Sequence, residues 1–172
     1  MDGAAPGPRC PVRNGVERAV AGRRGRGRLD RIKIDDRFEL VPHPPTLETY
    51  LSLRACTGLS PKTPEQGGAA VRGAWFFCHV RERASGRTVA MGRVVGDGGW
   101  YFQIADMATH PDFQGNGLGR LVLDTLLDRI RTHAPADPFI TLIADPPGRR
   151  LYAKAGFVET SPAVAMRFAG TD

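Results

Sequence analysis

Residues 100–130 read WYFQIADMATHPDFQGNGLGRLVLDTLLDRI, and the fold is decided here because two hydrophobic periodicities meet in this stretch. WYFQIADMAT, 100–109, is an apolar, strand-like run. From Gly117 to about His133 the pattern becomes that of an amphipathic helix, with an i, i+4 apolar ridge. The ridge consists of Leu118, Val122, Leu126 and Ile130. The stretch therefore predicts a strand, a glycine-rich loop and a helix in direct succession.

The loop between them, HPDFQGNGLGR, has the features of an anion site. A loop that leaves a strand and opens a helix exposes backbone N–H groups and the positive end of the helix dipole. Gly115, Gly117 and Gly119 lack the Cβ atoms that would keep a phosphate from the backbone. The spacing matches neither the dinucleotide fingerprint nor the P-loop. Taken alone, a glycine-rich turn without a ligand is an equally good interpretation.

The remainder of the domain predicts further strands and helices on both sides of this stretch. The predicted strands are Phe38–Val41, three antiparallel runs within 74–109, FITLIA at 139–144, Phe157–Thr160 and Val164–Phe168. The predicted helices run from the cap Thr46 to about Thr57, from Pro64 after the cap Thr63, from Gly117 to about His133, and over GRRLYAKA at 148–155. This order predicts an α/β (α+β) domain, a mixed sheet with helices on both faces.

The positive charge of the chain lies in its first residues. Residues 1–33 carry nine Lys or Arg against three Asp or Glu, which accounts for the whole net charge of +6. The segment 1–34 is rich in Gly, Pro and Arg and poor in large apolar residues, so we expect a disordered tail before a domain over 35–172. Its arginines could attract nucleic acid, but no interleaved aromatic offers a stacking surface, so a nucleic-acid partner is not expected.

The cysteines, the histidines and the apolar runs of the sequence indicate the compartment and the kinds of site to expect. Three cysteines without motif spacing favour a reducing, cytoplasmic protein without a disulfide framework. The four histidines show no metal-site spacing with them, so no metal is expected. No apolar run approaches about 18 residues, which argues against a membrane span.

Two segments together resemble a known family. HPDFQGNGLGR is similar to the acyl-CoA signature Q/R-x-x-G-x-G/A of the GNAT superfamily of N-acyltransferases, met by Gln114, Gly117 and Gly119. LYAKAGF, 151–157, resembles the second GNAT signature, with Tyr152 at its tyrosine. The resemblance covers roughly 38–168. It implies a mostly antiparallel twisted sheet of six to seven strands with a central splayed parallel pair, about four helices, and pairing of two copies as a homodimer.

The resemblance also implies where the cosubstrate acetyl-CoA lies. Its pyrophosphate would rest on the backbone amides of the loop, and its pantetheine would follow the strand before it. The implied cofactor-binding residues are Met107, Ala108, Thr109, Gln114, Gly115, Asn116, Gly117, Leu118, Gly119 and Arg120. Many relatives have an asparagine seven residues before the tyrosine. Here that position is Asp145, and the asparagine's role is not transferred to it.

Acyl transfer to an amine needs a proton acceptor for the amine, an oxyanion donor and a proton donor for the leaving thiolate. Tyr152 is the candidate donor, because a phenol holds its proton at neutral pH. A backbone amide at Met107 or Ala108 is the candidate oxyanion donor. Strict alternation would place Asp106 on one face with Phe102, Ile104, Ala108 and His110, a carboxylate in an otherwise apolar stripe. Burial would raise its pKa and make Asp106 the candidate proton acceptor. The alternatives are that Asp106 is structural and that His110, which ranks below Asp106, or an ordered water accepts the proton.

The sequence thus predicts an enzyme that transfers acetyl directly to a primary amine of a small molecule in a ternary complex. No cysteine lies in the signature, which argues against a covalent acyl-enzyme. We expect the acceptor pocket to include Tyr50, Arg54, Leu59, Trp75 and Tyr101. The alternatives are acetylation of a protein lysine or N-terminus, and a non-catalytic acyl-CoA-binding module with a nucleic-acid-binding tail.

Overall fold

A computed structural model describes residues 35–168, so the predicted disordered tail, 1–34, lies outside the described residues. The described chain forms one five-stranded sheet in the order β1-β2-β3-β4-β5. The strands are β1 (Phe38–Val41), β2 (Phe76–Glu82), β3 (Thr88–Gly96), β4 (Tyr101–Thr109) and β5 (Phe139–Leu142). The helices are α1 (Leu47–Cys56), α2 (Pro64–Arg72), α3 (Leu118–His133) and α4 (Arg149–Lys154), with short 3-10 turns η2 (Pro111–Phe113) and η3 (Pro146–Gly148).

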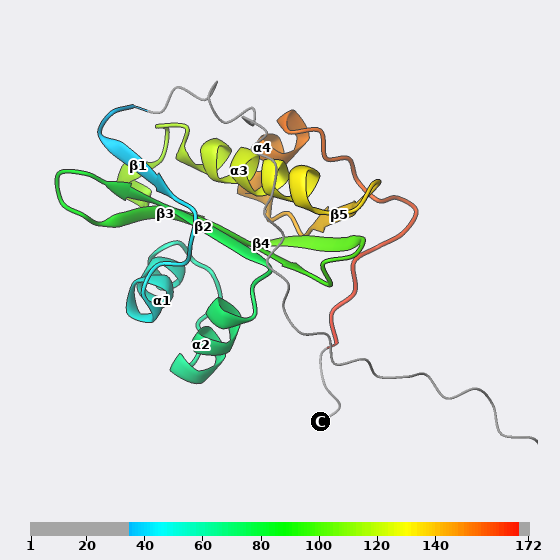
Figure 1. Ribbon diagram of the computed structural model, residues 1–172, viewed down its shortest axis with the longest axis horizontal. Helices are drawn as coiled ribbons and strands as arrows, with labels where there is room; N and C mark the ends of the chain where they lie inside the picture. The colour runs from blue at the N-terminus through cyan, green and yellow to red at the C-terminus, as the bar shows by residue number, and fades with distance from the viewer. Residues whose placement is uncertain (1–34, 169–172) are drawn as a thin grey trace, which may run out of the picture.

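The sheet is mixed, and helices cover both of its faces. β1 to β4 pair antiparallel in sequence order, and β5 joins β4 in parallel. α1 and α2 lie on one face, and α3 and α4 lie on the other (Figure 1). The mixed sheet, the antiparallel meander, the parallel pair and the four helices confirm the predictions.

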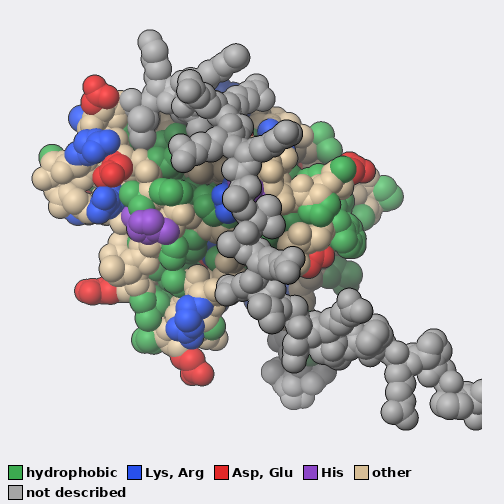
Figure 2. Space-filling view, viewed as in Figure 1, with side chains coloured by type: hydrophobic (Ala, Val, Ile, Leu, Met, Phe, Trp, Pro, Cys, Tyr) green, Lys and Arg blue, Asp and Glu red, His purple; other side chains and the backbone are tan. Residues whose placement is uncertain are grey.

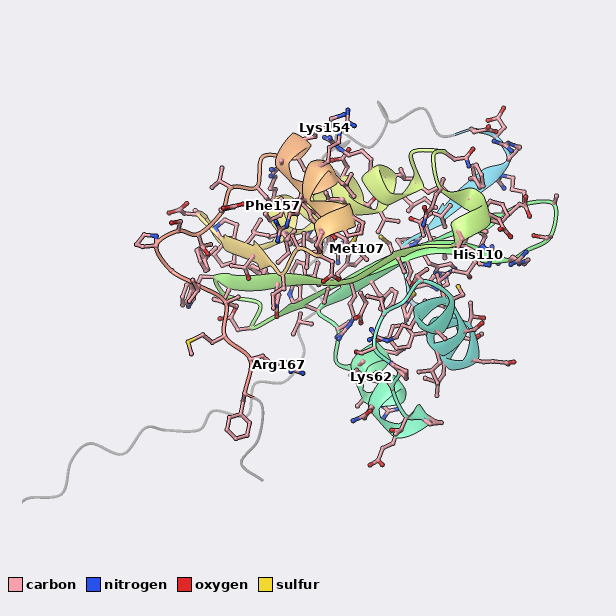
Figure 3. The ribbon with its side chains drawn as sticks, turned by 180° about the vertical axis from the view of Figure 1, so that it is seen from behind. Lys62, Met107, His110, Lys154, Phe157 and Arg167 are labelled. Carbon is pink, nitrogen blue, oxygen red and sulfur yellow. The ribbon has the colours of Figure 1, made fainter. Side chains whose placement is uncertain are left out.

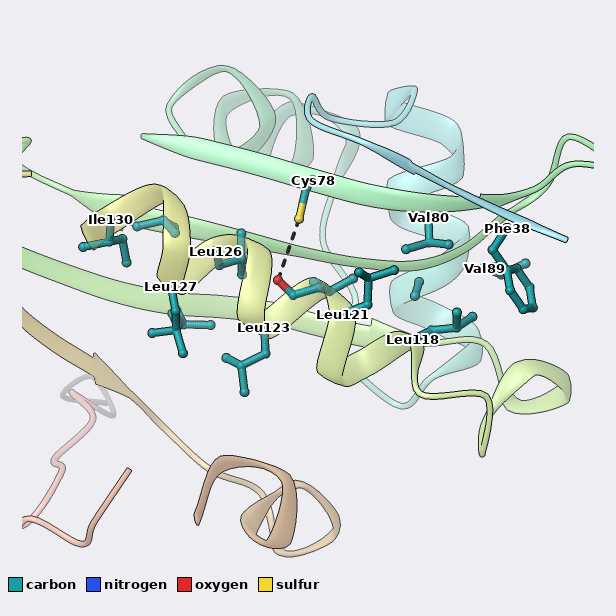
Figure 4. Packing of buried hydrophobic residues seen from close by; sticks show 14 of the residues in the cluster. Phe38, Cys78, Val80, Val89, Leu118, Leu121, Leu123, Leu126, Leu127 and Ile130 are labelled. Carbon is teal, nitrogen blue, oxygen red and sulfur yellow. Dashed lines mark hydrogen bonds between the residues drawn. The ribbon is translucent and has the colours of Figure 1, made fainter. Parts of the chain in front are cut away.

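The main core lies between α3 and the sheet. All four residues of the predicted α3 ridge are buried, together with the β2 side chains of Cys78 and Val80 (Figure 4). Burial raises the pKa of the Cys78 thiol to about 12, so this cysteine stays protonated and packs as a small apolar residue. Because α3 is fixed along most of its length, its first turn holds the preceding loop in a defined place.

The two helices on the opposite face begin at the predicted caps. Thr46 Oγ1 accepts from the backbone N–H of Thr49 at the start of α1. Thr63 and Gln66 form a capping box at the start of α2, with Pro64 in the first turn. These caps satisfy N–H groups that would otherwise lack partners, which helps a glycine-containing helix such as α2 to form.

The prediction of two closing strands is wrong. Phe157–Thr160 and Val164–Phe168 pair with no strand of the described chain, so the sheet has five strands rather than six to seven. A strand is stabilised by its ladder and by packing, and propensity alone does not create it. Between the two segments, Pro162 also has no N–H to donate to a ladder.

Candidate active site

A β-bulge in β4 organises the site. Arg93 of β3 pairs with Ala105 and Met91 pairs with Ala108, so two residues of β4, Asp106 and Met107, stand opposite the single residue Gly92. Asp106 adopts φ 54°, a conformation that aspartate tolerates better than most residues. A Cβ on Gly92 would lie 2.6 Å from Met107 Sδ, so glycine gives Met107 its space on the α3 side of the sheet.

The bulge overturns the prediction of a single apolar stripe along β4. Phe102 and Ile104 pack in the cluster under α3, whereas Ala108 packs in the cluster under α1 and α2. The side chain of Asp106 also contacts residues of α1. The extra residue shifts the alternation of faces by one, and the sequence pattern does not reveal that shift.

Asp106 is the centre of a partly buried polar network. The Tyr50 hydroxyl donates to Asp106 Oδ2 at 2.6 Å, and Arg93 Nε donates to the same oxygen at 2.5 Å. Arg54 Nη1 donates to Asp106 Oδ1, and Arg54 Nη2 donates to the Ser60 carbonyl at 2.8 Å. Tyr50 and Arg54 are four residues apart on α1, so both reach one carboxylate from one helix face.

This network sets the pKa of Asp106. Burial raises the pKa of the carboxyl, but hydrogen bonds from Tyr50 and Arg93 and the charges of Arg93 and Arg54 outweigh burial, so the pKa falls below its usual value. The expectation of a raised pKa is therefore wrong. Tyr50 and Arg54 are 1% and 4% exposed, so they form a buried support for β4 and do not line an open acceptor pocket as expected.

The glycine loop presents a run of unpaired donors. Gly115 and Gly117 have φ of 81° and 76°, and a Cβ at either position would have no neighbour within 4 Å. In residues 35–168, the backbone N–H groups of 115–120 donate to no protein acceptor. The Gln114 amide differs, because it donates to the Pro111 carbonyl at 3.2 Å. The run of free donors therefore starts at residue 115, one residue later than expected.

Side chains around the loop fix its shape. Asn116 Nδ2 donates to the Phe113 carbonyl at 3.0 Å, while Asn116 Oδ1 accepts from Arg37 Nη2 at 3.1 Å. Arg120 Nε donates to Asp124 at 2.8 Å, and Arg120 Nη1 donates to the Lys154 carbonyl at 3.3 Å, which links α3 to α4. Sequence reasoning missed Arg37, because it lies 79 positions before Asn116 and belongs to no motif.

The open part of the sheet lies beside this loop. β4 and β5 pair only as far as Ile104 and Leu142, while β4 continues to Thr109. Ala105 to Thr109 therefore have a sheet neighbour on the β3 side alone. In Figure 3, Met107 lies on this stretch and His110 at its end. The parallel pair that the family resemblance implied is thus present, and its pairing ends where β5 ends, at Leu142.

Tyr152 of α4 packs against the core beneath α3 and is half-buried. A Cβ on Gly148 would lie 2.8 Å from Tyr152 Cε2, so a glycine there leaves room for the ring. Burial raises the pKa of Tyr152, and the nearby Asp145 carboxylate raises it further. Tyr152 therefore holds its proton at neutral pH. The effect of Asp145 on Tyr152 was not predicted from the sequence. The position of Asp145, seven residues before Tyr152, was the signal that could have indicated it.

We expect Asp145→Asn to lower the pKa of Tyr152, because the substitution removes a negative charge that disfavours the phenolate. The pKa is measured by tyrosinate absorbance against pH, taking the difference between each protein and its Tyr152→Phe counterpart to isolate one tyrosine. Asp128→Asn, which removes a carboxylate of α3 that does not contribute to the raised pKa of Tyr152, serves as the control. An unchanged Tyr152 titration in Asp145→Asn would show that the two groups do not interact.

His110 contacts Arg87 and Asp112. Arg87 Nη2 lies 3.1 Å from His110 Nε2, and the backbone N–H of Asp112 donates to His110 Nδ1 at 3.3 Å. His110 also borders an open hollow of about 380 Å³ between α1 and the β2–β3 turn. Its lining includes neither Tyr152 nor the loop glycines, so this hollow is separate from the candidate site.

The described residues contain neither a metal-binding cluster nor a membrane-spanning helix. Among residues 35–168, no group of three or more His, Cys, Asp or Glu side chains is arranged to hold a metal ion. Over the same range, no helix combines the length and the apolar character that crossing a membrane requires.

Comparisons with known proteins agree with this geometry. A family model described as "Acetyltransferase (GNAT) domain" matches residues 75–168. The chain is 34% identical over 88 residues to an uncharacterized N-acetyltransferase of Pyropia yezoensis, over 51% of this chain and 49% of the relative. It thus spans about half the length of the curated relatives that it matches.

Solved structures share the fold. A probable acetyltransferase of unknown function from meticillin-resistant Staphylococcus aureus superposes with a TM-score of 0.71 at 34% identity, over 78% of this chain and 99% of that one. A predicted acetyltransferase from Clostridium acetobutylicum, solved with acetyl-CoA, gives a TM-score of 0.59 at 18% identity, over 76% and 96% of the two chains. The second similarity shows the fold alone.

Proposed function

The chain belongs to the GNAT acetyltransferase family, and from this membership we propose that it transfers the acetyl group of acetyl-CoA directly to a primary amine of a small molecule. The observation that carries the proposal is the run of unpaired amides at 115–120, which follows the stretch of β4 that has no β5 neighbour. Tyr152, which holds its phenolic proton, supplies a candidate proton donor. Acetyl-CoA supplies an anionic diphosphate for the amides and a thioester for the chemistry.

The cofactor would be held largely by main chain. We assign its pyrophosphate to the amides of Gly115, Asn116, Gly117, Leu118, Gly119 and Arg120. Each favourable anion contact at an exposed helix N-terminus contributes roughly 0.3–1 kcal/mol, so several amides acting together are needed. The pantetheine would lie along Met107, Ala108 and Thr109, where β4 has lost its β5 neighbour. Gln114 would contribute through loop geometry, since its side chain donates to the Thr109 carbonyl at 3.4 Å.

In the reaction the amine loses two protons. The ammonium group passes its first proton to a base or to water. The neutral nitrogen then forms a bond to the thioester carbon, and a backbone amide of Met107 or Ala108 stabilises the oxyanion. As the C–S bond breaks, the departing thiolate takes the phenolic proton of Tyr152, and the second proton of the nitrogen passes to the tyrosinate. The products are an N-acetyl amine and CoA thiol, and Tyr152 is protonated again.

In this proposal Asp106 has a structural role, whereas the sequence predicted that it accepts the proton of the amine. Its carboxylate already accepts hydrogen bonds from Tyr50, Arg54 and Arg93, and its pKa is lowered, so it is a weak proton acceptor. We assign Asp106 to holding the bulge that places Met107 and Ala108. The exposed Asp145 carboxylate or an ordered water then receives the proton of the ammonium group.

Thiol release from acetyl-CoA tests the activity directly. The full chain is assayed with polyamines, arylalkylamines, amino acids and aminoglycosides, and binding of CoA is measured in parallel by calorimetry. We expect turnover with at least one class of amine. CoA binding without turnover on any amine would leave a non-catalytic acyl-CoA-binding module, and lack of CoA binding would remove the proposal as a whole.

Gly117→Ala should weaken CoA binding at least about tenfold. Residue 117 has a positive φ, and the added Cβ would enter the open space to which we assign the phosphate. Gly86→Ala in the β2–β3 turn is a matched control, with φ 70° and likewise no neighbour within 4 Å. Both variants should lose about 1–2 kcal/mol of stability from left-handed strain. Calorimetry with CoA and urea unfolding measure the two effects. Equal CoA affinity in both variants would contradict the assigned phosphate site.

A further inference from the structure

The hollow between α1 and the β2–β3 turn has the size of a ligand site. Its volume of about 380 Å³ falls within the range of about 300–1,000 Å³ that is usual for small-molecule pockets. One wall is a face of α1, which presents Glu48, Ser52 and Cys56 at intervals of four residues. The turn supplies the other wall with Arg87 and Thr88. Figure 2 shows both basic and acidic side chains at the left-hand end of the molecule, where Figure 1 places this turn.

The polar side chains of this lining are available to a ligand. Among residues 35–168, the carboxylate of Glu48 and the hydroxyls of Ser52 and Thr88 form no hydrogen bond with a protein group. Cys56 carries an exposed thiol. Leu53, the large apolar residue of the lining, is 3% exposed, because it packs in the cluster under α1 and α2. The hollow therefore suits a small polar molecule better than an apolar one.

The two walls also carry opposite charges. Within the described residues, neither Glu48 nor Arg87 takes part in an ion pair. Neighbouring rings fix the guanidinium of Arg87: its Nη2 lies 3.1 Å from His110 Nε2, and its Cζ lies 5.9 Å from the centroid of the Phe113 ring. Figure 3 shows His110 at the end of the sheet, beside α1. The remaining N–H groups of Arg87 suit a carboxylate, which a guanidinium binds through two parallel hydrogen bonds.

We propose that this hollow binds a small amino acid, with the carboxylate of the ligand on Arg87 and its ammonium group on Glu48. Opposite charges on the two walls match a molecule that carries both charges, whereas a simple anion or cation would leave one wall without a partner. Ser52 and Thr88 offer hydrogen bonds to the other polar atoms of the ligand. Tyr152 does not line the hollow, so the amino acid is held apart from the proposed acetyl transfer.

Nuclear magnetic resonance of the full chain without CoA tests the site independently of the proposed enzyme activity. The probes are the common L-amino acids and the ω-amino acids from β-alanine to 6-aminohexanoate, which vary the distance between the two charges. We expect at least one probe to bind with a Kd of about 0.1–10 mM and to shift the amide signals of 48–56 and 86–88. The N-acetyl derivative and the carboxamide of that probe each lack one charge and should bind at least about tenfold more weakly. Equal binding of either derivative would contradict the two-charge site.

Substitutions on the two walls locate the charges. Arg87→Gln and Glu48→Gln should each weaken the binding of that amino acid at least about tenfold. Arg83→Gln is the control for the first, since Arg83 is exposed on the same turn and does not line the hollow. Glu65→Gln is the control for the second, because Glu65 lies in the first turn of α2 as Glu48 does in the first turn of α1. Circular dichroism checks that all four variants keep the fold.

The thiol of Cys56 reports on the same hollow by a different chemistry. Cys56 is exposed and Cys78 is buried, so iodoacetamide should alkylate Cys56 faster, and peptide mass spectrometry separates the two sites. The amino acid at ten times its Kd should slow the alkylation of Cys56 about tenfold. The proposal fails if no probe binds. It also fails if binding leaves Cys56 unprotected or is unchanged in Arg87→Gln and Glu48→Gln, since the ligand would then lie elsewhere.

Discussion

Tyr152→Phe is expected to lower kcat for acetyl transfer by about 10²–10⁴-fold, the usual contribution of a positioned proton donor. CoA affinity should stay within about twofold, because the phenyl ring still packs against Phe157 and the core. The measurement is steady-state thiol release together with calorimetry of CoA. Since burial and Asp145 raise the pKa of Tyr152, the wild-type rate should decline with rising pH only above the ordinary tyrosine value of about 10.

Thr132→Val is the control for that experiment. Thr132 is exposed near the end of α3, and its hydroxyl donates to the Asp128 carbonyl at 2.6 Å. The substitution removes a hydroxyl that belongs to no part of the candidate site, so it should leave kcat unchanged. If Tyr152→Phe retained full kcat, the thiolate would be taking its proton elsewhere, and the assignment of Tyr152 would fall.

Asp106→Asn is expected to lower the free energy of unfolding by about 3–5 kcal/mol. The substitution keeps the shape of the side chain but leaves Arg54 and Arg93, whose side chains are 5% and 17% exposed, without their counterion. Urea unfolding followed by tryptophan fluorescence measures the change. Asp124→Asn removes the more exposed ion pair with Arg120 and should cost no more than about 1 kcal/mol.

The pH dependence gives an independent check on the same network. The pKa of Asp106 is lowered in the folded protein, so its contribution to stability is present above the unfolded value of about 3.9. It is lost as the pH falls through the folded value. Wild-type stability should therefore drop over that acid range by more than the stability of Asp106→Asn, whose amide does not titrate. Parallel acid profiles in the two proteins would contradict the pKa direction.

Local sequence patterns predict a large part of this fold. The α3 ridge, the caps Thr46 and Thr63 and the meander are dictated by periodicity and capping, which act over a few residues. The glycine loop belongs to the same class, since its glycines between a strand and a helix determine which amides are exposed. These elements form through interactions between residues of the same segment, so the sequence of the segment is enough to predict them.

The features that the sequence did not predict depend on contacts between residues far apart in the chain. The bulge at Asp106 depends on the register with β3 and on the space that Gly92 leaves, so alternation along β4 misplaced the carboxylate. The lowered pKa needs Arg54 and Arg93, which reach Asp106 across 52 and 13 positions of the chain. The closing strands failed for a related reason: their pattern was present, but a strand also needs a partner, and none lies in the described chain.

The glycine loop has an evolutionary consequence. A binding site built from main-chain nitrogens depends on backbone angles more than on side chains, so we expect positions 115 and 117 to keep glycine in related sequences. Surface residues ordinarily vary most among relatives, yet these two are exposed and constrained. Under the proposed function, relatives could therefore differ in the acceptor amine and keep the same main-chain contacts to the cofactor.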